Sequence, residues 1–445
     1  MVELIANVNN AINGFVWGVP MLVLLVGTGI LMTILTKFFQ LSHIAHWFKN
    51  TVGGIFHDKH VTKHTDADDQ SISQFQSLCT ALAATIGTGN IVGVASALVA
   101  GGPGAIFWMW VVAFFGMMTN YSENVLGIYY RRRNSKGEWS GGAMYYLKDG
   151  LGSYKGCKQI GAVLAVLFSA FCLLASFGIG NMSQVNSIAA NMTSAFSIPA
   201  TVTGIVLVII GALVIVGGLK RIAAVTEKLV PFMAIAYGMK RGVFSNEAGL
   251  GSSVMVHSSS NVKEPVRQGM WGIFEVFADT MVVCTLTAFA VLSSGLIDLD
   301  TGAVLVDVSG SALVGQAFAT VFGSFGPAFI AIAILLFAFS TVLGWSHYGS
   351  KACEYLFGTK STIVYKVAFV LMIFIGCTMN LGLAWDLSDT FNGLMAIPNL
   401  IGVIALSPVV MKITKNYVAR IIKKEDVKPM LSVFPEIQEE QEKAM

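Results

Sequence analysis

The stretch SLCTALAATIGTGNIVGVASALVAGGPGAIFWMW, residues 77–110, decides the fold. It is long enough to cross a bilayer, yet helix-weakening residues lie at the middle of its first apolar run: Thr85, Gly87, Thr88, Gly89 and Asn90. Unpaired backbone groups are costly in hydrocarbon, so an unwound segment persists there only inside protein or beside a polar cavity. Two interpretations stay open, a binding site or a glycine-rich helix that packs closely against a neighbour. The polar side chains favour the site, because such groups at membrane depth tend to be functional.

The composition indicates an integral membrane protein with many spans. The chain has 445 residues, of which 55% are hydrophobic and 12% are charged, and its mean hydropathy is +0.70. The net charge of +3 is small and the basic residues are dispersed through short loops, so we expect no nucleic-acid partner. The cysteines lack close paired spacing, so we expect buried thiols and neither metal nor redox chemistry. They are Cys79, Cys157, Cys172, Cys284, Cys353 and Cys377.

Apolar runs predict nine complete membrane spans in one all-α domain over residues 1–428. The predicted spans are residues 12–36, 74–100, 104–130, 160–182, 201–218, 268–295, 327–350, 367–384 and 390–411. Loops rich in Lys and Arg alternate with loops that lack them, which predicts an outside N-terminus and a cytoplasmic C-terminus. The first run has no cleavage pattern and is read as a retained span. The acidic, Gln-rich tail over residues 429–445 is expected to be disordered.

The segment LVPFMAIAY, residues 229–237, opens like a further span but stops early. A helical crossing needs about twenty residues, so this partial span cannot cross alone. The following segment FSNEAGLGSS, residues 244–253, is too polar for lipid. We therefore expect residues 219–267 to lie on one cytoplasmic face.

Other polar side chains interrupt the later spans. Gln184 could face a substrate or hydrogen-bond to a neighbouring helix. Glu275 and Asp279 share a helical face that would suit a cation or proton route, and we expect Glu275 near the inner interface and Asp279 buried. Ser340 and Thr341 are adjacent mid-span hydroxyls, which could bind a hard cation such as sodium or bond back to their own helix.

Four blocks of sequence carry a family resemblance over nearly the whole chain up to the tail. They are GTGNIVGVASAL, GGPGAIFWMWVVAFFG, GGAMYYL with DGLG, and RGVFSNEAGLGS. Their order and content resemble the alanine or glycine:cation symporter family of bacteria and archaea. The resemblance implies a fold of two inverted five-helix repeats in the inner (plasma) membrane. It also implies sodium-coupled, or sometimes proton-coupled, import of a small neutral amino acid, alanine or glycine, by alternating access.

The resemblance also implies roles for individual residues. The unwound segment from Thr85 to Asn90 would cradle the charged groups of the amino acid, with Gln184 lining the site and Trp345 limiting substrate size. A sodium site would combine hydroxyls with backbone carbonyls, those of Ser340, Thr341, Ala83 and Ala84. Sodium would be the coupling ion, with no other cofactor. No nucleophile–base constellation is present, so we do not expect an enzyme.

The chain departs from the family at the junction Tyr237/Gly238. Family members continue from a segment like LVPFMAIAY through the rest of that span, an outer loop and a Gly-rich broken span. Here Tyr237 abuts Gly238, so about one and a half spans are missing. The lost full span would be the inverted-repeat counterpart of the broken span 74–100, and thus half of the substrate cradle. The alternative to a working symporter is therefore a transport-inactive deletion form, or a membrane binding or sensing remnant.

Overall fold

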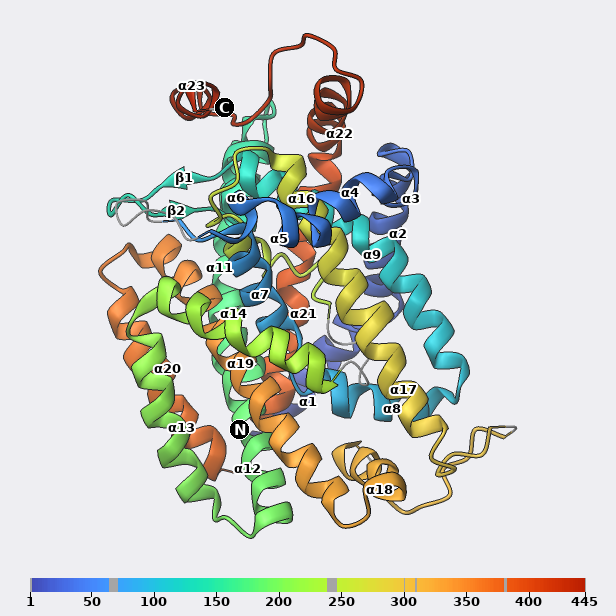
Figure 1. Ribbon diagram of the computed structural model, residues 1–445. Coiled ribbons are helices and arrows are strands. Elements are labelled where there is room, and N and C mark those ends of the chain that lie inside the picture. The colour runs from blue at the N-terminus through green and yellow to red at the C-terminus, as the bar shows by residue number, and fades with distance from the viewer. Residues whose placement is uncertain are drawn as a thin grey trace.

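The computed structural model describes residues 2–63, 71–237, 246–299, 301–308, 310–379 and 382–444. Nearly all of the secondary structure is helical, and the longest helices run roughly alongside one another (Figure 1). The C-terminus lies at the top of this view and the N-terminus in its lower half. The protein is an all-α polytopic membrane protein, as its composition indicates.

Within the described residues, five stretches of helix are long and apolar enough to cross a bilayer. They contain α1 (Val2–Val16) with α2 (Val19–Leu35), α9 (Gly104–Tyr129), α11 (Lys158–Phe177) with α12 (Ser183–Phe196), α16 (Pro265–Val276) with α17 (Thr285–Leu292), and α19 (Phe325–Phe357). The π-helical turns η4 (Gly178–Met182) and η5 (Phe277–Cys284) join the halves of two of these stretches. Such turns often occur at functional sites.

Three further helix pairs are apolar enough to span together but bend at a short break. The pairs are α7 (Gln74–Thr85) with η1 (Gly89–Gly93) and α8 (Val94–Gly101), bent by 57°, α13 (Ala200–Ile215) with α14 (Gly218–Tyr237), bent by 117°, and α21 (Gly382–Ala405) with α22 (Ser407–Tyr417) and η6 (Val418–Ile422), bent by 57°. The first bend coincides with the predicted unwound segment. A capping box between Ser73 and Gln76 fixes where α7 begins.

Each of the nine predicted spans overlaps one of these helices or the shorter apolar helix α20 (Thr362–Thr378), but several bounds differ. The span predicted to end at residue 182 continues to Phe196, because η4 keeps the backbone helical across its glycines. LVPFMAIAY forms the end of α14, which starts at Gly218. The junction residue Gly238 lies outside the described residues.

Short elements cover one end of the bundle, at the top of Figure 1. The helices there are α3 (Phe39–Ser42), α4 (Ile44–Asn50), α5 (Val52–His57) and α6 (Lys59–Thr62), beside the antiparallel strands β1 (Arg132–Arg133) and β2 (Trp139–Ser140). Helix α18 (Gly310–Phe322) lies at the opposite end. The remaining short helices are α10 (Ala143–Tyr145), η2 (Tyr146–Gly150), η3 (Leu151–Ser153) and α15 (Val254–His257).

The tail after residue 428 contains helix α23 (Pro435–Lys443), where we expected disorder. Proline at the start of a helix and an acidic residue in the first turn both favour helix formation. The tail is also held to the bundle, because the N–H of Val433 donates to the carbonyl of Tyr129 over 3.1 Å. Arg133 on β1 and Glu440 on α23 form an ion pair at 2.9 Å.

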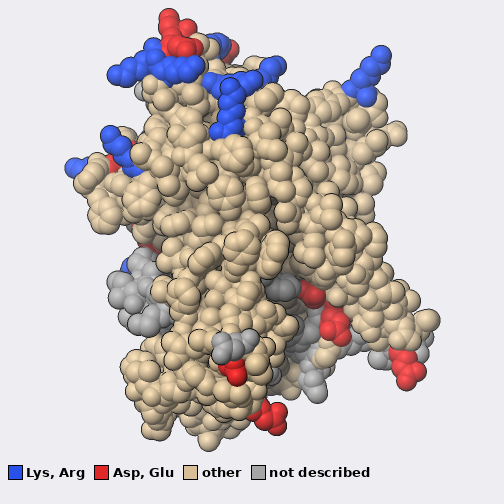
Figure 2. Space-filling view, turned by 90° about the vertical axis from the view of Figure 1, so that its right-hand side faces the viewer, with Lys and Arg blue, Asp and Glu red and all other residues tan. Residues whose placement is uncertain are grey.

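Charge is divided between the two ends of the molecule. On the face in Figure 2, Lys and Arg gather mostly at the end that carries the C-terminus, and most visible Asp and Glu lie toward the other end. A broad belt between them shows few charged residues. This is the pattern of a chain whose middle is embedded in lipid.

Close packing of α19 on α7 positions the broken helix. A Cβ built on Gly344 would lie 2.5 Å from the Cβ of Ala84, so only glycine permits this approach. Gly344 follows Thr341 by one helical turn, which brings the mid-span hydroxyls of α19 against the end of α7.

Candidate functional site

A cavity of about 360 Å³ lies at the break between α7 and η1. Its walls come from these elements, from α12, α19 and α21, and from the loop between α14 and α15. The structure brings to it all seven residues that the resemblance assigns to substrate: Thr85, Gly87, Thr88, Gly89, Asn90, Gln184 and Trp345. Pockets of this size hold small molecules in many proteins.

Side-chain oxygens hold the backbone N–H groups at the break. The N–H of Gly87 donates to Oδ1 of Asn90 over 3.2 Å, and the N–H of Thr88 donates to Oε1 of Gln184 over 3.0 Å. Gln184 therefore both lines the cavity and joins α12 to the break, which combines the two interpretations left open for it. These contacts satisfy backbone groups that an intact helix would have paired internally.

Gly87 has no room for a side chain. A Cβ built there would lie 2.5 Å from Oγ1 of Thr341 and 3.0 Å from Oε1 of Gln184. Glycine is therefore required here, because α19 and α12 approach the break closely and place the polar atoms of Thr341 and Gln184 against the α-carbon of Gly87.

The hydroxyls of Ser340 and Thr341 meet the broken helix. Ser340 Oγ lies 3.2 Å from the carbonyl oxygen of Ala83, and Thr341 Oγ1 lies 3.2 Å from that of Ile86. Both hydroxyls are also close to the carbonyl of Phe337, at 2.7 and 3.2 Å, so back-bonding within α19 occurs as well.

The second carbonyl at this cluster differs from the one expected. The oxygen that meets Thr341 belongs to Ile86, whereas Ala84 packs beneath Gly344. Ile86 ends α7 with φ −77° and ψ 83°, which is not a helical conformation, so its carbonyl leaves the helix direction. Two neighbouring hydroxyl–carbonyl pairs thus join α19 to the end of α7, and such oxygens are ligands that a hard cation accepts.

Glu247 is a residue at the cavity that sequence analysis missed. Its Oε1 accepts a hydrogen bond from the indole N–H of Trp345 over 3.0 Å, and its Oε2 accepts one from Ser252. We expected residues 219–267 to lie on one cytoplasmic face, and within this stretch the structure places Glu247 and Leu250 at the wall of the cavity. The family block FSNEAG, which contains Glu247, was the available signal.

Two more carboxylates reach the cavity from the first part of α21. Asp386 and Asp389 line it, and Asn13 of α1 donates to Oδ2 of Asp389 over 3.0 Å. The polar run DLSDTFN, residues 386–392, was a visible but unused signal. The described lining residues include three carboxylates and no Lys or Arg, so the cavity favours a cation or an ammonium group.

The two acidic residues of the stretch α16–α17 are both buried. Asp279 was expected to be buried, and its Oδ1 accepts a hydrogen bond from Nδ2 of Asn90 over 2.7 Å. Glu275 was expected near the interface, which is wrong. Its Oε2 lies 2.9 Å from Nε2 of His257 and 3.2 Å from Nδ2 of Asn120, and such partners compensate the cost of burying a carboxylate.

The chain matches known proteins over most of its length. The sequence model of the sodium:alanine symporter family matches residues 2–237 and 234–431. The chain is 43% identical over 451 positions to the sodium/alanine symporter AgcS of Methanococcus maripaludis, covering 92% of this chain and 96% of that protein. It is 37% identical to an uncharacterized transporter of Haemophilus influenzae, and the alignment covers 94% of this chain and 97% of that protein. It is 32% identical to a Bacillus subtilis protein described as a probable sodium/glutamine symporter, covering 94% and 91%.

Proposed function

Because the chain belongs to the sodium:alanine symporter family, whose members couple amino-acid transport to a cation, we propose that it imports alanine or glycine together with sodium. One observation carries the proposal. At the break of α7, hydroxyl and carbonyl oxygens converge beside a cavity that is lined by carboxylates. An ion site and a substrate site that share one broken helix provide a physical route for coupling.

The proposed sodium site consists of four oxygens. The Ser340 hydroxyl lies within hydrogen-bond distance of the Ala83 carbonyl, and the Thr341 hydroxyl lies within hydrogen-bond distance of the Ile86 carbonyl. When a cation enters, each hydroxyl rotates so that its lone pairs face the ion, and the carbonyls already present oxygen to the same space. Because the oxygens come from α7 and α19, the ion would hold the two helices together.

The proposed amino-acid site lies next to this cluster. The substrate carboxylate would lie at the start of the half-helix η1–α8, near the backbone of Gly87 and Thr88. The N-terminal end of a helix dipole is positive and stabilises an anion. The Glu247 carboxylate suits the ammonium group on the opposite side of the cavity. Trp345 restricts the remaining space, which favours a small neutral side chain.

Uptake of labelled alanine into proteoliposomes tests the proposal. We expect accumulation when a sodium gradient points inward and no accumulation when potassium replaces sodium. Glycine should compete, and glutamate should not. If sodium does not stimulate uptake of either amino acid, the chain is not an active symporter, although its family membership stands.

A transport-inactive deletion form is the second candidate. The family match is split into two segments that meet at residues 234–237, where α14 ends. The alignment with the Methanococcus protein is 451 positions long. It contains 92% of the 445 residues of this chain, or about 409 residues. Roughly 42 positions of the relative therefore have no counterpart in this chain. Both facts support an internal deletion at Tyr237/Gly238. In an inverted five-plus-five repeat, that deletion removes the partner of the broken helix.

Reinsertion separates the two candidates. The segment of the Methanococcus relative that has no counterpart here is inserted between Tyr237 and Gly238, and the uptake of both proteins is compared. Uptake by the natural chain favours the active symporter. Uptake that occurs only after reinsertion favours the remnant.

We also propose that the N-terminus lies outside and the C-terminus in the cytoplasm. The gathering of Lys and Arg at the C-terminal end supports this orientation (Figure 2). Alkaline phosphatase fused to the C-terminus should be inactive, whereas a fluorescent protein fused there should fold and fluoresce. The reverse result would contradict the orientation.

A further inference from the structure

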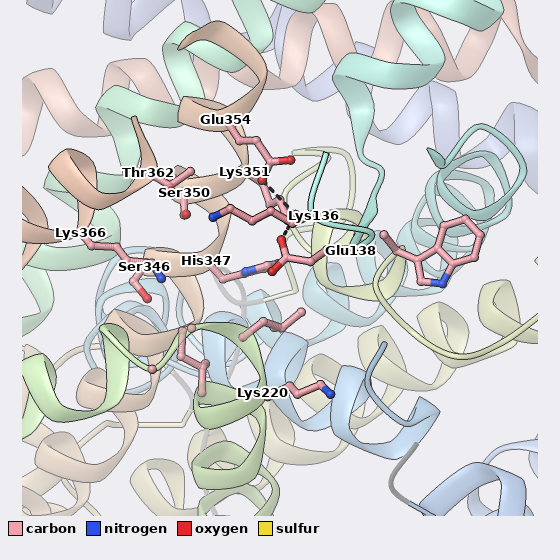
Figure 3. Close-up of a pocket in the computed structure, with 15 residues that line it drawn as sticks. Lys136, Glu138, Lys220, Ser346, His347, Ser350, Lys351, Glu354, Thr362 and Lys366 are labelled. Carbon is pink, nitrogen blue, oxygen red and sulfur yellow. Dashed lines mark hydrogen bonds and ion pairs between the residues drawn. The ribbon is translucent and has the colours of Figure 1, made fainter. Parts of the chain in front are cut away.

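A second cavity, of about 200 Å³, lies apart from the candidate functional site (Figure 3). It is bounded by the turn between β1 and β2, the start of α14, the last turns of α19 and the start of α20. None of its lining residues lines the cavity at the break of α7. The transport proposal therefore leaves it without a role.

Basic side chains outnumber acidic ones around this cavity. Lys136, Lys220, Lys351 and Lys366 line it, against two carboxylates. Lys351 takes up both carboxylates, since its Nζ lies 3.1 Å from Oε2 of Glu354 and 3.9 Å from Oε2 of Glu138.

Lys136 and Lys366 are the cations left over. Neither forms an ion pair with a carboxylate among the described residues. Lys136 belongs to the exposed turn of the hairpin, and Lys366 is half-buried in the second turn of α20. Their positive charges approach one cavity from opposite elements, which is unfavourable unless an anion lies between them.

Two helix N-termini add to the positive potential. Helix α14 begins at Gly218 and α20 begins at Thr362, and both residues line the cavity. Nζ of Lys366 lies only 3.7 Å from the position of a Cβ built on Gly218. A cation next to a helix N-terminus is repelled by the helix dipole, whereas an anion there is stabilised.

His347 supplies an independent sign of a ligand. Its side chain lines the cavity and is 5% exposed, and its Nε2 has no hydrogen-bond partner among the residues that the structure describes. A buried polar atom without a partner is costly, so a ligand atom that pairs with it would be favoured. Nε2 can donate to an anionic oxygen when it carries the proton.

We propose that this cavity binds a phosphate-type oxyanion, either free phosphate or the headgroup of an anionic lipid. Several oxygens on one tetrahedral centre match groups that line the cavity from a hairpin and two helices, namely Lys136, Lys366 and His347. The hairpin β1–β2, which bounds the site, lies toward the end of the molecule where Lys and Arg gather (Figure 1 and Figure 2), as expected for a site open to lipid headgroups or soluble phosphate.

Occupancy would affect the helix that carries the candidate ion ligands. His347 follows Trp345 by two residues on α19, so an anion here would hold α19 against α14 and α20. This inference does not depend on transport, because binding to the cavity can be measured without it.

The test measures the melting temperature of the full-length protein in detergent. One arm compares sodium phosphate with sodium chloride at equal ionic strength and equal sodium concentration. A second arm compares dihexanoyl phosphatidic acid with the phosphatidylcholine of the same chain length. The variants are Lys136→Gln and Lys366→Gln, and Lys155→Gln is the matched control, because Lys155 is exposed and does not line the cavity.

We expect phosphate to raise the melting temperature of the wild type and of Lys155→Gln along a saturating curve. Each cavity variant should need about tenfold more phosphate for the same rise. A response to both compounds identifies the shared oxyanion, and a response only to phosphatidic acid identifies the headgroup as its source.

An equal response of all three variants would overturn the proposal, as would chloride reproducing the effect of phosphate or the absence of any response in both arms. If Lys366→Gln does not fold, Lys136→Gln decides alone, because its side chain is exposed on a turn.

Discussion

The indole N–H of Trp345 donates a hydrogen bond to Oε1 of Glu247 over 3.0 Å, which joins α19 to the loop before α15. Trp345 was expected at the cavity from family resemblance, whereas Glu247 was not. The bond orients the Glu247 carboxyl group in a cavity that Asp386 and Asp389 also line and that has no Lys or Arg among its described lining residues. It also fixes the ring that restricts the space for a substrate side chain.

The first prediction concerns the charge of Glu247. Glu247→Gln keeps the size of the side chain and can still accept from Trp345, but it removes the negative charge that would pair with the substrate ammonium. We expect alanine binding to weaken by about 10- to 100-fold, since a hydrogen bond to a charged group contributes about 1.5–3 kcal/mol. Titration calorimetry of alanine in sodium buffer measures this effect.

Glu440→Gln is the control, because Glu440 lies on α23 in an exposed ion pair with Arg133. Its alanine affinity should equal that of the wild type. Unchanged affinity in Glu247→Gln would remove the carboxylate from the substrate site.

The second prediction concerns Gly87. In Gly87→Ala the new methyl group would lie 2.5 Å from Oγ1 of Thr341, so α19 or the break must move. Overpacking of this kind costs about 1–3 kcal/mol, and we expect a lower melting temperature together with loss of stabilisation by sodium.

Gly14→Ala provides the matched control, because nothing lies within 4 Å of a Cβ at this position in α1. It should leave the response to sodium intact and change stability by less than about 1 kcal/mol, in the stabilising direction. Equal behaviour of the two variants would show that the break tolerates a side chain.

Sequence alone located the break in α7 because its cause is local. Thr85, Gly87 and Asn90 weaken a helix wherever they occur, and their position inside an apolar run is visible without a structure. Local sequence also singled out the mid-span hydroxyls of Ser340 and Thr341, whereas their place beside the broken helix was implied by the family resemblance.

The burial of Glu247 could not be derived from its local sequence, because it depends on partners far away in the chain or on the opposite side of a turn, and only the family block FSNEAG pointed to this residue. A carboxylate reads as solvated unless groups such as the indole of Trp345 and the hydroxyl of Ser252 are known to reach it. The expected carbonyl pair, Ala83 and Ala84, likewise did not include Ile86, whose oxygen lies at Thr341, two residues after Ala84. The backbone of Ile86, which turns out of the helix, is a consequence of where the break falls.

The third prediction concerns Thr341. Thr341→Val keeps the shape of the side chain and removes the hydroxyl that lies 3.2 Å from the carbonyl of Ile86. Because one of four proposed oxygen ligands is lost, we expect about tenfold weaker sodium binding. The measurement is the sodium concentration that gives half of the maximal rise in melting temperature, with potassium replacing sodium so that the ionic strength stays constant.

Thr28→Val is the control for this measurement. Thr28 is also a buried threonine, but among the described residues its hydroxyl bonds only to the carbonyl of Leu24 in its own helix, at 2.7 Å. If both variants lose the sodium response, the effect comes from removing any buried threonine hydroxyl in a helix and not from the proposed site.

The last prediction separates two roles of Asp279. Its Oδ1 accepts from Nδ2 of Asn90, whose own Oδ1 accepts from the N–H of Gly87, so a chain of hydrogen bonds runs from α16–α17 to the break. Asp279→Asn keeps an acceptor for Asn90, whereas Asp279→Ala leaves the buried amide without one, a loss of about 1–3 kcal/mol. If Asp279 acts only by holding Asn90, the asparagine variant should melt and bind sodium like the wild type, and only the alanine variant should be impaired. If its negative charge attracts the cation, both variants should bind sodium more weakly, and the asparagine variant should do so without a matching loss of melting temperature. Sodium titrations of the two variants side by side therefore distinguish a positioning residue from a charge that acts on the ion itself.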